Sequence, residues 1–304
     1  MMRILDYLFA GRPLLHLPVW TVYLVTLHYH QIISGDRFNG TDLILMVCLS
    51  MLFAGAYYLN QVYDAESDRI NKKLGFLQRG LLTEKAMVTL FLLLSVGAVL
   101  IASFISNASA IIFLLIFVLS YAYSTPPFRL KDRPLGGLFA NAVAYGFLVS
   151  IAVMPDLNIN NIGMLGWDNP IYFTLTVGAI YCVTTVPDIE GDAAVGKRTV
   201  AVVWGRRPTL VIGLVLMLLS ILVAYRSGYQ VLAILSALGS LLIIPAIVSL
   251  SAKPILLAAK LPIFLLTLLA GYFFPIYFLF IVALLFATRI YYKKRFDVIY
   301  PRLA

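Results

Sequence analysis

The feature that most constrains this chain is a series of apolar stretches without a charged residue, each roughly 17 to 24 residues long. A helix of that length crosses a hydrocarbon core about 30 Å thick. Of the 304 residues, 62% are hydrophobic and only 12% are charged, which is more apolar surface than a soluble core of this size can bury. A soluble globular enzyme is therefore excluded, and the sequence predicts an all-α, polytopic membrane bundle.

These stretches predict nine or ten transmembrane helices in a single domain over residues 1–304. The first eight cover residues 13–33, 43–60, 86–105, 109–125, 135–155, 169–187, 208–225 and 229–252. The last region, residues 254–292, is interrupted only by Lys260 and Arg289, and it holds one long helix or two short ones that turn near residues 271–275. Cys48 and Cys182 both lie inside apolar stretches, so neither a disulfide nor a cysteine metal site is expected. The N-terminus lacks the pattern of a removable signal peptide.

The distribution of Lys and Arg among the loops predicts the orientation. A formal net charge of +9 would suggest a nucleic-acid partner in a soluble domain, but basic loops beside membrane spans mainly report orientation. The loops after spans two, four and six are basic, whereas the loops on the other side hold only Arg37 and Arg226. The positive-inside rule therefore places the N-terminus and the basic loops in the cytoplasm. The basic C-terminal tail favours ten spans, because an even number returns the tail to that side.

A first acidic motif ends the second span. It reads Asn60-x-x-x-Asp64-x-x-x-Asp68. Steps of four residues keep the three side chains on one helix face, with about 40° of drift per step, so their oxygens can converge on a shared partner. A solvated helix end is the alternative interpretation of an isolated pair of this kind.

A second acidic motif on the same predicted side weakens that alternative. It ends the sixth span and reads Asp188-x-x-x-Asp192, followed by Gly196 and Lys197. Mg²⁺ prefers carboxylate oxygens and is commonly bound by one or two carboxylates together with substrate phosphates. Two facing clusters therefore suit Mg²⁺ ions that hold a diphosphate. Without a metal, carboxylates crowded in this way are expected to repel one another, so replacing one by Asn is expected to change stability little.

Several cations near the two motifs are candidates for stabilising a diphosphate leaving group. They are Lys72, Lys73, Arg129, Lys131, Lys197 and Arg198. For each of them, a role as an orientation signal is the competing interpretation. The stretch from Gly191 to Thr199 imitates a phosphate-binding loop, but Arg198 stands where Ser or Thr is required and no strand precedes it, so that interpretation is discarded.

Together these motifs resemble the UbiA superfamily of intramembrane prenyltransferases. The resemblance rests on the two acidic motifs, on Gly196-Lys197-x-Thr199 and on the segment from Tyr123 to Lys131, and it begins at Arg12-Pro13. It implies a bundle of usually nine spans whose cavity opens to the cytoplasm and to lipid. It also implies Mg²⁺, a prenyl diphosphate donor and a hydrophobic or aromatic acceptor. The metal and diphosphate ligands it implies are Asn60, Asp64, Asp68, Asp188 and Asp192, with Arg129, Lys131 and Lys197 as further diphosphate contacts.

The chain departs from the family pattern in two places. Thr184 and Thr185 stand where many members have Lys and Asp, which puts acceptor activation in question. Gly75-Phe76 stands where many members have Arg-Pro, and Arg79 is a candidate substitute from a shifted position.

The predicted mechanism is Mg²⁺-assisted ionisation of an allylic diphosphate, with the apolar bundle keeping water from the carbocation. The prenyl tail is expected among aromatic side chains, and Asn141 in the fifth span is expected to line the cavity or to bond a neighbouring helix. The aromatic candidates are Tyr57, Tyr58, Phe139 and Tyr145. His28 and His30 are expected to have a polar or interfacial role away from the acids.

Two other classes compete with the prenyltransferase. An ion-coupled transporter would use buried acids, but those are expected at broken helices near the middle of the membrane, whereas these acids end helices on one side. A transferase of nucleotide-activated lipid head groups also has Asp pairs, but the spacing of the two motifs argues against it. The sequence does not identify the acceptor or the prenyl chain length, and it shows no dedicated protein partner.

Overall fold

The computed structural model describes residues 2–70, 75–155, 157 and 166–301, and every regular element in these ranges is helical. The first half comprises α1 (Met2–Ala10), η1 (Pro13–His16), α2 (Leu17–Ser34), α3 (Gly40–Tyr63), α4 (Ala65–Ile70), α5 (Glu84–Ile105), α6 (Asn107–Ser124) and η2 (Leu130–Asp132). The second half comprises α7 (Pro134–Asn141), η3 (Ala142–Leu148), α8 (Val149–Ile151), α9 (Asp168–Thr185), α10 (Ile189–Ala194), α11 (Val200–Trp204), α12 (Arg206–Arg226), α13 (Gln230–Ser249), α14 (Ala252–Phe273) and α15 (Pro275–Phe296).

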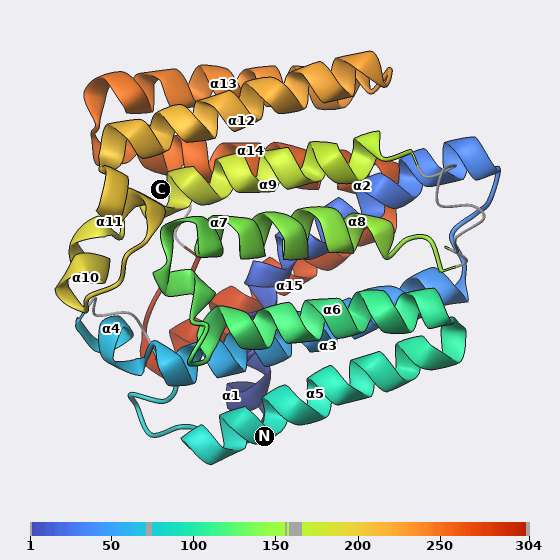
Figure 1. Ribbon diagram of the computed structural model, residues 1–304. Coiled ribbons are helices and arrows are strands. Elements are labelled where there is room, and N and C mark those ends of the chain that lie inside the picture. Colours follow the sequence, from blue (N-terminus) through green and yellow to red (C-terminus); the bar gives the residue numbers. More distant parts are fainter. Residues whose placement is uncertain (1, 71–74, 156, 158–165, 302–304) are drawn as a thin grey trace.

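The long helices form one bundle, and the short helices α4, α10 and α11 gather at one of its ends (Figure 1). Nine helical stretches within the described ranges are long and apolar enough to cross a membrane. α9 is not among them because it begins with the polar residues Asp168 and Asn169, yet it packs lengthwise against α12 inside the same bundle. The all-α membrane architecture predicted from the sequence is confirmed.

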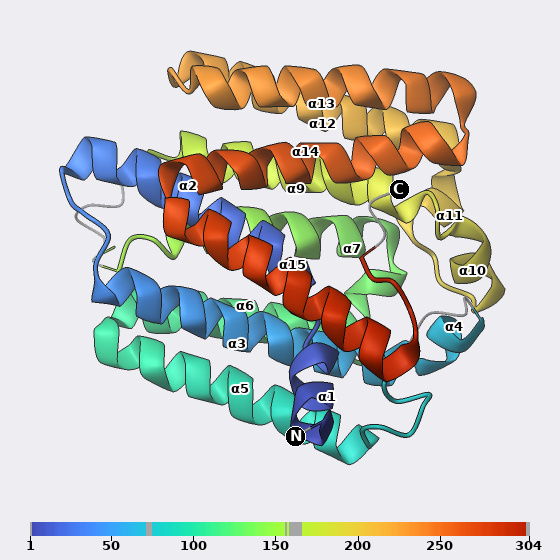
Figure 2. The same ribbon diagram turned by 180° about the vertical axis from the view of Figure 1, so that it is seen from behind.

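The region after residue 252 consists of two helices, which resolves the choice left open by the sequence. α14 and α15 each have 22 residues and meet at Phe274, directly before Pro275. A proline at the first position of a helix needs no hydrogen-bond donor, so α15 begins there. α15 crosses α2 and α3 diagonally and ends beside α1, on the side of α4 and α10 (Figure 2). The end of α15 therefore lies on the side of the acidic motifs, as its basic residues indicated.

Local sequence signals explain the turns that align the bundle. Asn39 caps α3 by accepting hydrogen bonds from the backbone of Thr41 and Asp42, and the Asp42 carboxylate accepts one from the Asn39 backbone. Such a reciprocal capping box satisfies backbone donors that a helix N-terminus leaves open. Ser106 ends α5 and caps α6, so two long helices reverse direction over one residue.

The fifth predicted span is not a uniform α-helix. It contains the π-helical segment η3 between α7 and α8, and η3 packs against α9. A Cβ atom on Gly146 would lie 2.6 Å from the Cα atom of Thr174, so only glycine permits this approach. Single π-helical turns inside α-helices are frequent at functional sites, and this one forms a wall of the cavity described below.

Candidate active site

The first acidic motif continues the helical path of α3 beyond its end. Asp64 is the last residue before α4, and the backbone amides of Asp64 and Asp68 still bond the carbonyls four residues earlier, at 2.8 Å each. The predicted shared face is therefore realised across the junction of α3 and α4. Asp64 and Asp68 are both buried, at 8% and 5% exposure.

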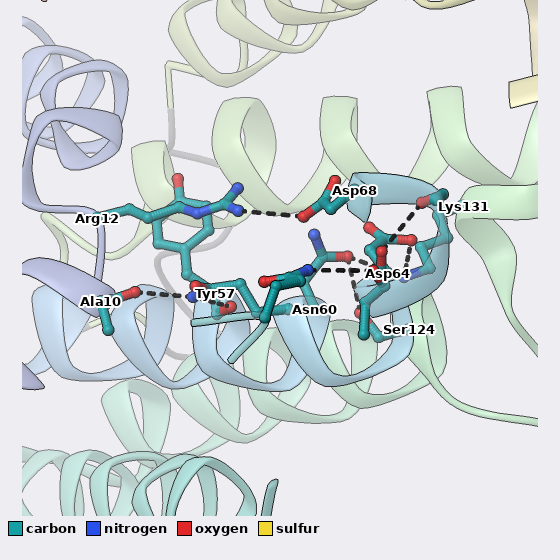
Figure 3. A network of polar contacts seen from close by, with 12 residues as sticks. Ala10, Arg12, Tyr57, Asn60, Asp64, Asp68, Ser124 and Lys131 are labelled. Carbon is teal, nitrogen blue, oxygen red and sulfur yellow. Dashed lines mark hydrogen bonds and ion pairs between the residues drawn. The ribbon is translucent and has the colours of Figure 1, made fainter. Parts of the chain in front are cut away.

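Two lysines from distant segments converge on Asp64. Lys131 Nζ in η2 and Lys197 Nζ after α10 each lie 2.9 Å from Asp64 Oδ1. Lys131 Nζ also donates a hydrogen bond to Asn60 Oδ1 at 3.0 Å, and the hydroxyl of Ser124 donates to the same oxygen. Figure 3 shows Lys131 and Asp64 facing each other at the end of the helix that carries Asn60.

The second acidic motif meets the first through Lys197. Its Nζ lies 3.6 Å from Asp192 Oδ1 as well as 2.9 Å from Asp64 Oδ1, so one ammonium joins both motifs. Asp188 directly precedes α10, and Asp192 is buried within that helix. Gly196 turns the chain with a φ of 73°, and the Lys197 amide then donates to the Asp192 carbonyl. This glycine turn brings Lys197 back over the acids.

The charges of this cluster shift its pKa values. Burial of Asp64 acts to raise its pKa, but Lys131 and Lys197 together outweigh burial and hold the pKa below its usual value. Burial lowers the pKa of Lys131 despite the adjacent Asp64. For Lys197, burial is outweighed by the charges of Asp64 and Asp192, and the pKa is raised. Lys197 is therefore positively charged at neutral pH.

Repulsion among bare carboxylates, expected from the sequence, is wrong for Asp64. The expectation counted only the acids, whereas two lysines from other segments neutralise them here. Within the described ranges no three Asp, Glu, His or Cys side chains are grouped so that they could hold one metal ion, and the Lys197 ammonium lies between Asp64 and Asp192. The five-residue metal set stays a prediction.

A cavity of about 160 Å³ adjoins Asn60. Its polar lining includes Tyr57, Tyr123, Asn141 and Tyr145, from α3, α6 and the fifth span. The hydroxyls of Tyr57 and Tyr145 lie 2.9 Å apart, and Asn141 Nδ2 donates a hydrogen bond to the Gly137 carbonyl at 2.9 Å. Asn141 therefore lines the cavity, as expected.

Sequence reasoning missed Arg12 as a site residue. Its Nη2 atom lies 3.5 Å from Asp68 Oδ2, and it approaches the first motif from the side opposite Lys131 (Figure 3). Arg12 has a φ of 53° between α1 and η1, and it also lines the cavity. The signal that marks it is a cation directly before the first span.

Other expected contacts differ in the structure. Arg129 Nε pairs with Asp132 Oδ2 at 2.7 Å, and the Arg129 side chain is 40% exposed. Tyr58 donates to the Tyr7 carbonyl and Phe139 is 60% exposed, so neither lines the cavity. Tyr57 and Ala140, the residues next to them in the sequence, line the cavity instead. Lys72 and Lys73 lie outside the described residues.

The structure also shows where the residues that depart from the family pattern lie. Thr184 and Thr185 end α9, and their hydroxyls donate to the carbonyls of Tyr181 and Cys182. Arg79 lies over the ring of Phe296, with its Cζ atom 4.9 Å from the ring centroid. His28 stacks on Phe273 at the opposite end of the bundle, as expected for a residue away from the acids.

Comparison with known proteins decides the family. The model of the UbiA prenyltransferase family matches residues 18–261. The chain belongs to the UbiA prenyltransferase family. It is 28% identical over 176 residues to a digeranylgeranylglyceryl phosphate synthase of Thermococcus sibiricus, covering 58% of this chain and 60% of that protein. It is 28% identical over 191 residues to a 2-acyl-4-prenylphloroglucinol 6-prenyltransferase of Humulus lupulus. That match covers 59% of this chain and 44% of the relative.

The chain thus spans about half the length of the curated relatives it matches. Among solved structures, a UbiA homologue from Archaeoglobus fulgidus bound to DMAPP and Mg²⁺ superposes with a TM-score of 0.69 at 18% identity, covering 88% of this chain and 99% of that one. The structure of a digeranylgeranylglyceryl phosphate synthase superposes with a TM-score of 0.66 at 18% identity, covering 89% of this chain and 97% of that one. The UbiA fold is therefore shared, and the comparisons give no support to the transporter alternative.

Proposed function

We propose that this UbiA-family protein is a Mg²⁺-dependent intramembrane prenyltransferase, which moves a prenyl group from a prenyl diphosphate to an aromatic or lipid acceptor. The observation that carries the proposal is the contact of Lys197 with both Asp64 and Asp192. It brings the two acidic motifs to one place beside the cavity that adjoins Asn60. The named activities of the relatives support the same reaction class.

The chemistry of the acidic side chains suits Mg²⁺, although Lys197 stands between Asp64 and Asp192 in this structure. Asp64, Asp68 and Asp192 offer buried carboxylate oxygens, the ligand type that Mg²⁺ prefers, and the Asn60 amide oxygen adds a neutral one. A cation is already favoured at this place, because the Lys197 ammonium occupies it. When bound, Mg²⁺ would neutralise negative charge on the diphosphate and so ease its departure.

Lys131 and Lys197 are the residues we assign to the leaving group. Bond cleavage between the allylic carbon and the diphosphate oxygen leaves the electron pair on the diphosphate, whose charge increases. Fixed cations in a buried site stabilise such developing charge more strongly than cations in water. Both ammonium groups are anchored by Asp64, so they need little reorganisation as the bond breaks.

The aromatic cavity is the place we assign to the reacting carbons. Tyr57, Tyr123 and Tyr145 line it together with Phe53, and aromatic faces stabilise a nearby cation. Their apolar ring faces also offer little to water, which would otherwise capture the carbocation. A separate apolar groove of about 650 Å³, which shares no lining residue with this cavity, lies between α2, α3 and the start of α15.

The acids and basic loops share one end of the bundle, and we assign that end to the cytoplasm by the positive-inside rule. The opposite loops retain only Arg37 and Arg226 as basic residues in the sequence. The lipid bilayer is then the medium from which both hydrophobic substrates enter.

Purified protein tested with radiolabelled prenyl diphosphates of several lengths and with aromatic and glycerol phosphate acceptors provides the direct test. We expect a labelled lipophilic product that disappears with EDTA and returns with Mg²⁺. A protein that transfers no prenyl group to any acceptor, while it binds prenyl diphosphate and stays folded, would contradict the proposal.

A further inference from the structure

Two tyrosine hydroxyls form a short chain of hydrogen bonds on the wall of the cavity that adjoins Asn60. Tyr57 Oη lies 2.9 Å from Tyr145 Oη, and it also lies 2.9 Å from the carbonyl oxygen of Leu15 in η1. Tyr57 is on α3, the helix that carries Asn60 (Figure 3), whereas Tyr145 is on η3. Both tyrosines line the cavity, and both are half-buried. The chain therefore runs from a backbone carbonyl to the cavity wall.

The backbone carbonyl determines the direction of this chain. A carbonyl oxygen only accepts hydrogen bonds, and a tyrosine hydroxyl has one proton to donate. Tyr57 therefore donates to the Leu15 carbonyl, because those two oxygens would otherwise face each other at 2.9 Å without a proton between them. Tyr145 then donates its own proton to Tyr57. The Tyr145 oxygen keeps lone pairs, but it has no proton left for a ligand in the cavity.

Packing around the two rings holds this arrangement in place. His16, the residue after Leu15, is 5% exposed, and its ring centroid lies 5.5 Å from that of Tyr57. The ring centroid of Tyr145 lies 4.4 Å from that of Phe53. A hydrogen-bond chain between packed groups is polarised in one direction along its whole length. A ligand that enters the cavity therefore meets Tyr145 as a hydrogen-bond acceptor.

The other side-chain oxygen at this wall of α3 is already occupied. Asn60 Oδ1 accepts hydrogen bonds from Lys131 Nζ and from the Ser124 hydroxyl. Tyr145 Oη, by contrast, has Tyr57 as its one hydrogen-bond partner among the residues that the structure describes. The cavity has a volume of about 160 Å³, and a cavity of about 150 Å³ can hold a benzene ring. It therefore has room for one ring whose substituent reaches Tyr145.

We propose that Tyr145 selects the acceptor substrate by accepting a hydrogen bond from one of its hydroxyl groups, and that it disfavours an ether oxygen at the same position. Tyr57 is the positioning residue, because it takes the proton that Tyr145 would otherwise offer. An ether oxygen and Tyr145 Oη would face each other with lone pairs alone, which leaves both oxygens unsatisfied. The inference rests on the proposed function for the word substrate, whereas the binding preference itself requires no turnover.

The test measures equilibrium binding of 4-fluorophenol and 4-fluoroanisole to the full-length protein in detergent by fluorine NMR, without prenyl diphosphate and without Mg²⁺. The two probes share one ring, but only the phenol has a proton to donate. Titration of protein-free micelles gives the detergent background to subtract. We expect the phenol to bind about tenfold more tightly than the ether, because the ether provides no donor for Tyr145 Oη.

The two tyrosines give variants with different expected results. Tyr145→Phe removes the accepting oxygen, so phenol binding should weaken about tenfold and the preference for the phenol should disappear. Tyr57→Phe keeps that oxygen and frees the Tyr145 proton, so ether binding should strengthen about threefold while phenol binding stays near wild type. A preference caused only by the size of the methyl group would not weaken phenol binding in Tyr145→Phe.

Tyr225→Phe is the matched control, because Tyr225 is 75% exposed on α12 and does not line the cavity. It should bind both probes as the wild type does. Melting temperatures of the three variants in detergent report whether each one is folded. Wild-type protein that binds the two probes equally, or does not bind them, would overturn the proposal. A phenol preference that Tyr145→Phe leaves unchanged would overturn it as well.

The outcomes separate this inference from the proposed function. A phenol preference that depends on Tyr145, in a protein that transfers no prenyl group, would reject the enzyme and keep the hydroxyl site. Prenyl transfer by a protein without this preference would keep the enzyme and reject the role of Tyr145.

Discussion

The Nζ atom of Lys197 lies 2.9 Å from Asp64 Oδ1, and this contact connects the turn after α10 with the end of α3. Asp64 also receives Lys131, so its carboxylate holds two cations from separate segments. The cluster therefore stabilises the end of the bundle that carries the acidic motifs, and it holds two cations there for an anionic ligand.

Asp64→Asn is expected to destabilise the protein, because it leaves two lysines near one another without their shared anion. Removing one partner of a buried ion pair costs about 3 kcal/mol. The measurement is the melting temperature in detergent, which we expect to fall. Adding Lys131→Met to Asp64→Asn should restore part of the loss, and a double variant that melts no higher than the single one would show that the pair is not coupled.

The low pKa of Asp64 predicts a pH dependence of stability. A carboxyl whose pKa is lower in the folded than in the unfolded state contributes stability that is present above its unfolded pKa and lost as the pH falls through the folded pKa. The unfolded value is about 3.9, so the contribution should be complete above about pH 5 and decline below about pH 4. Melting curves should lose this acid-dependent component in Asp64→Asn, and an unchanged profile would argue against the ion pairs.

Arg295→Gln is expected to release α1 from α15, since it leaves the buried Asp6 carboxylate without its ion-pair partner. Hydrogen exchange of the α1 amides should then accelerate while exchange in α9 stays unchanged. The exposed neighbour Lys294 provides the control, and Lys294→Gln should exchange as the wild type does. Similar exchange in both variants would refute a specific role for Arg295.

The side of the C-terminal segment is testable by cysteine labelling. Ile299→Cys should react with an impermeant maleimide only from the cytoplasmic side, and Ile33→Cys only from the opposite side, because both positions are exposed at opposite ends of the bundle. The natural cysteines Cys48 and Cys182 are buried, so their background is low. Labelling of Ile299→Cys from outside would contradict the crossing of α15.

Most of the fold was accessible from the sequence, since the length and spacing of apolar stretches determine which segments cross a membrane. Both acidic motifs were also found, because their four-residue spacing is local. Contacts between segments distant in the sequence could not be predicted in this way. Arg12 depends on a left-handed turn, and the pairing of Lys131 and Lys197 with Asp64 depends on loops that a helical pattern does not place. The partial burial of α15 against α1 likewise required the tertiary structure.

The central claim is that the two acidic motifs act together on a prenyl diphosphate, and steady-state turnover of Asp64→Asn and Asp192→Asn tests it most directly. Glu66→Gln and Glu190→Gln are matched controls, because these acids belong to the same two segments but are mostly exposed. Each tenfold loss of rate is about 1.4 kcal/mol of barrier, and removing one anionic ligand is expected to cost several such factors. We predict at least a hundredfold loss of Mg²⁺-dependent prenyl transfer in both Asp variants in folded protein, with the controls near wild type. Transfer that persists within about tenfold in both Asp variants, or that proceeds without a divalent cation, would contradict the account.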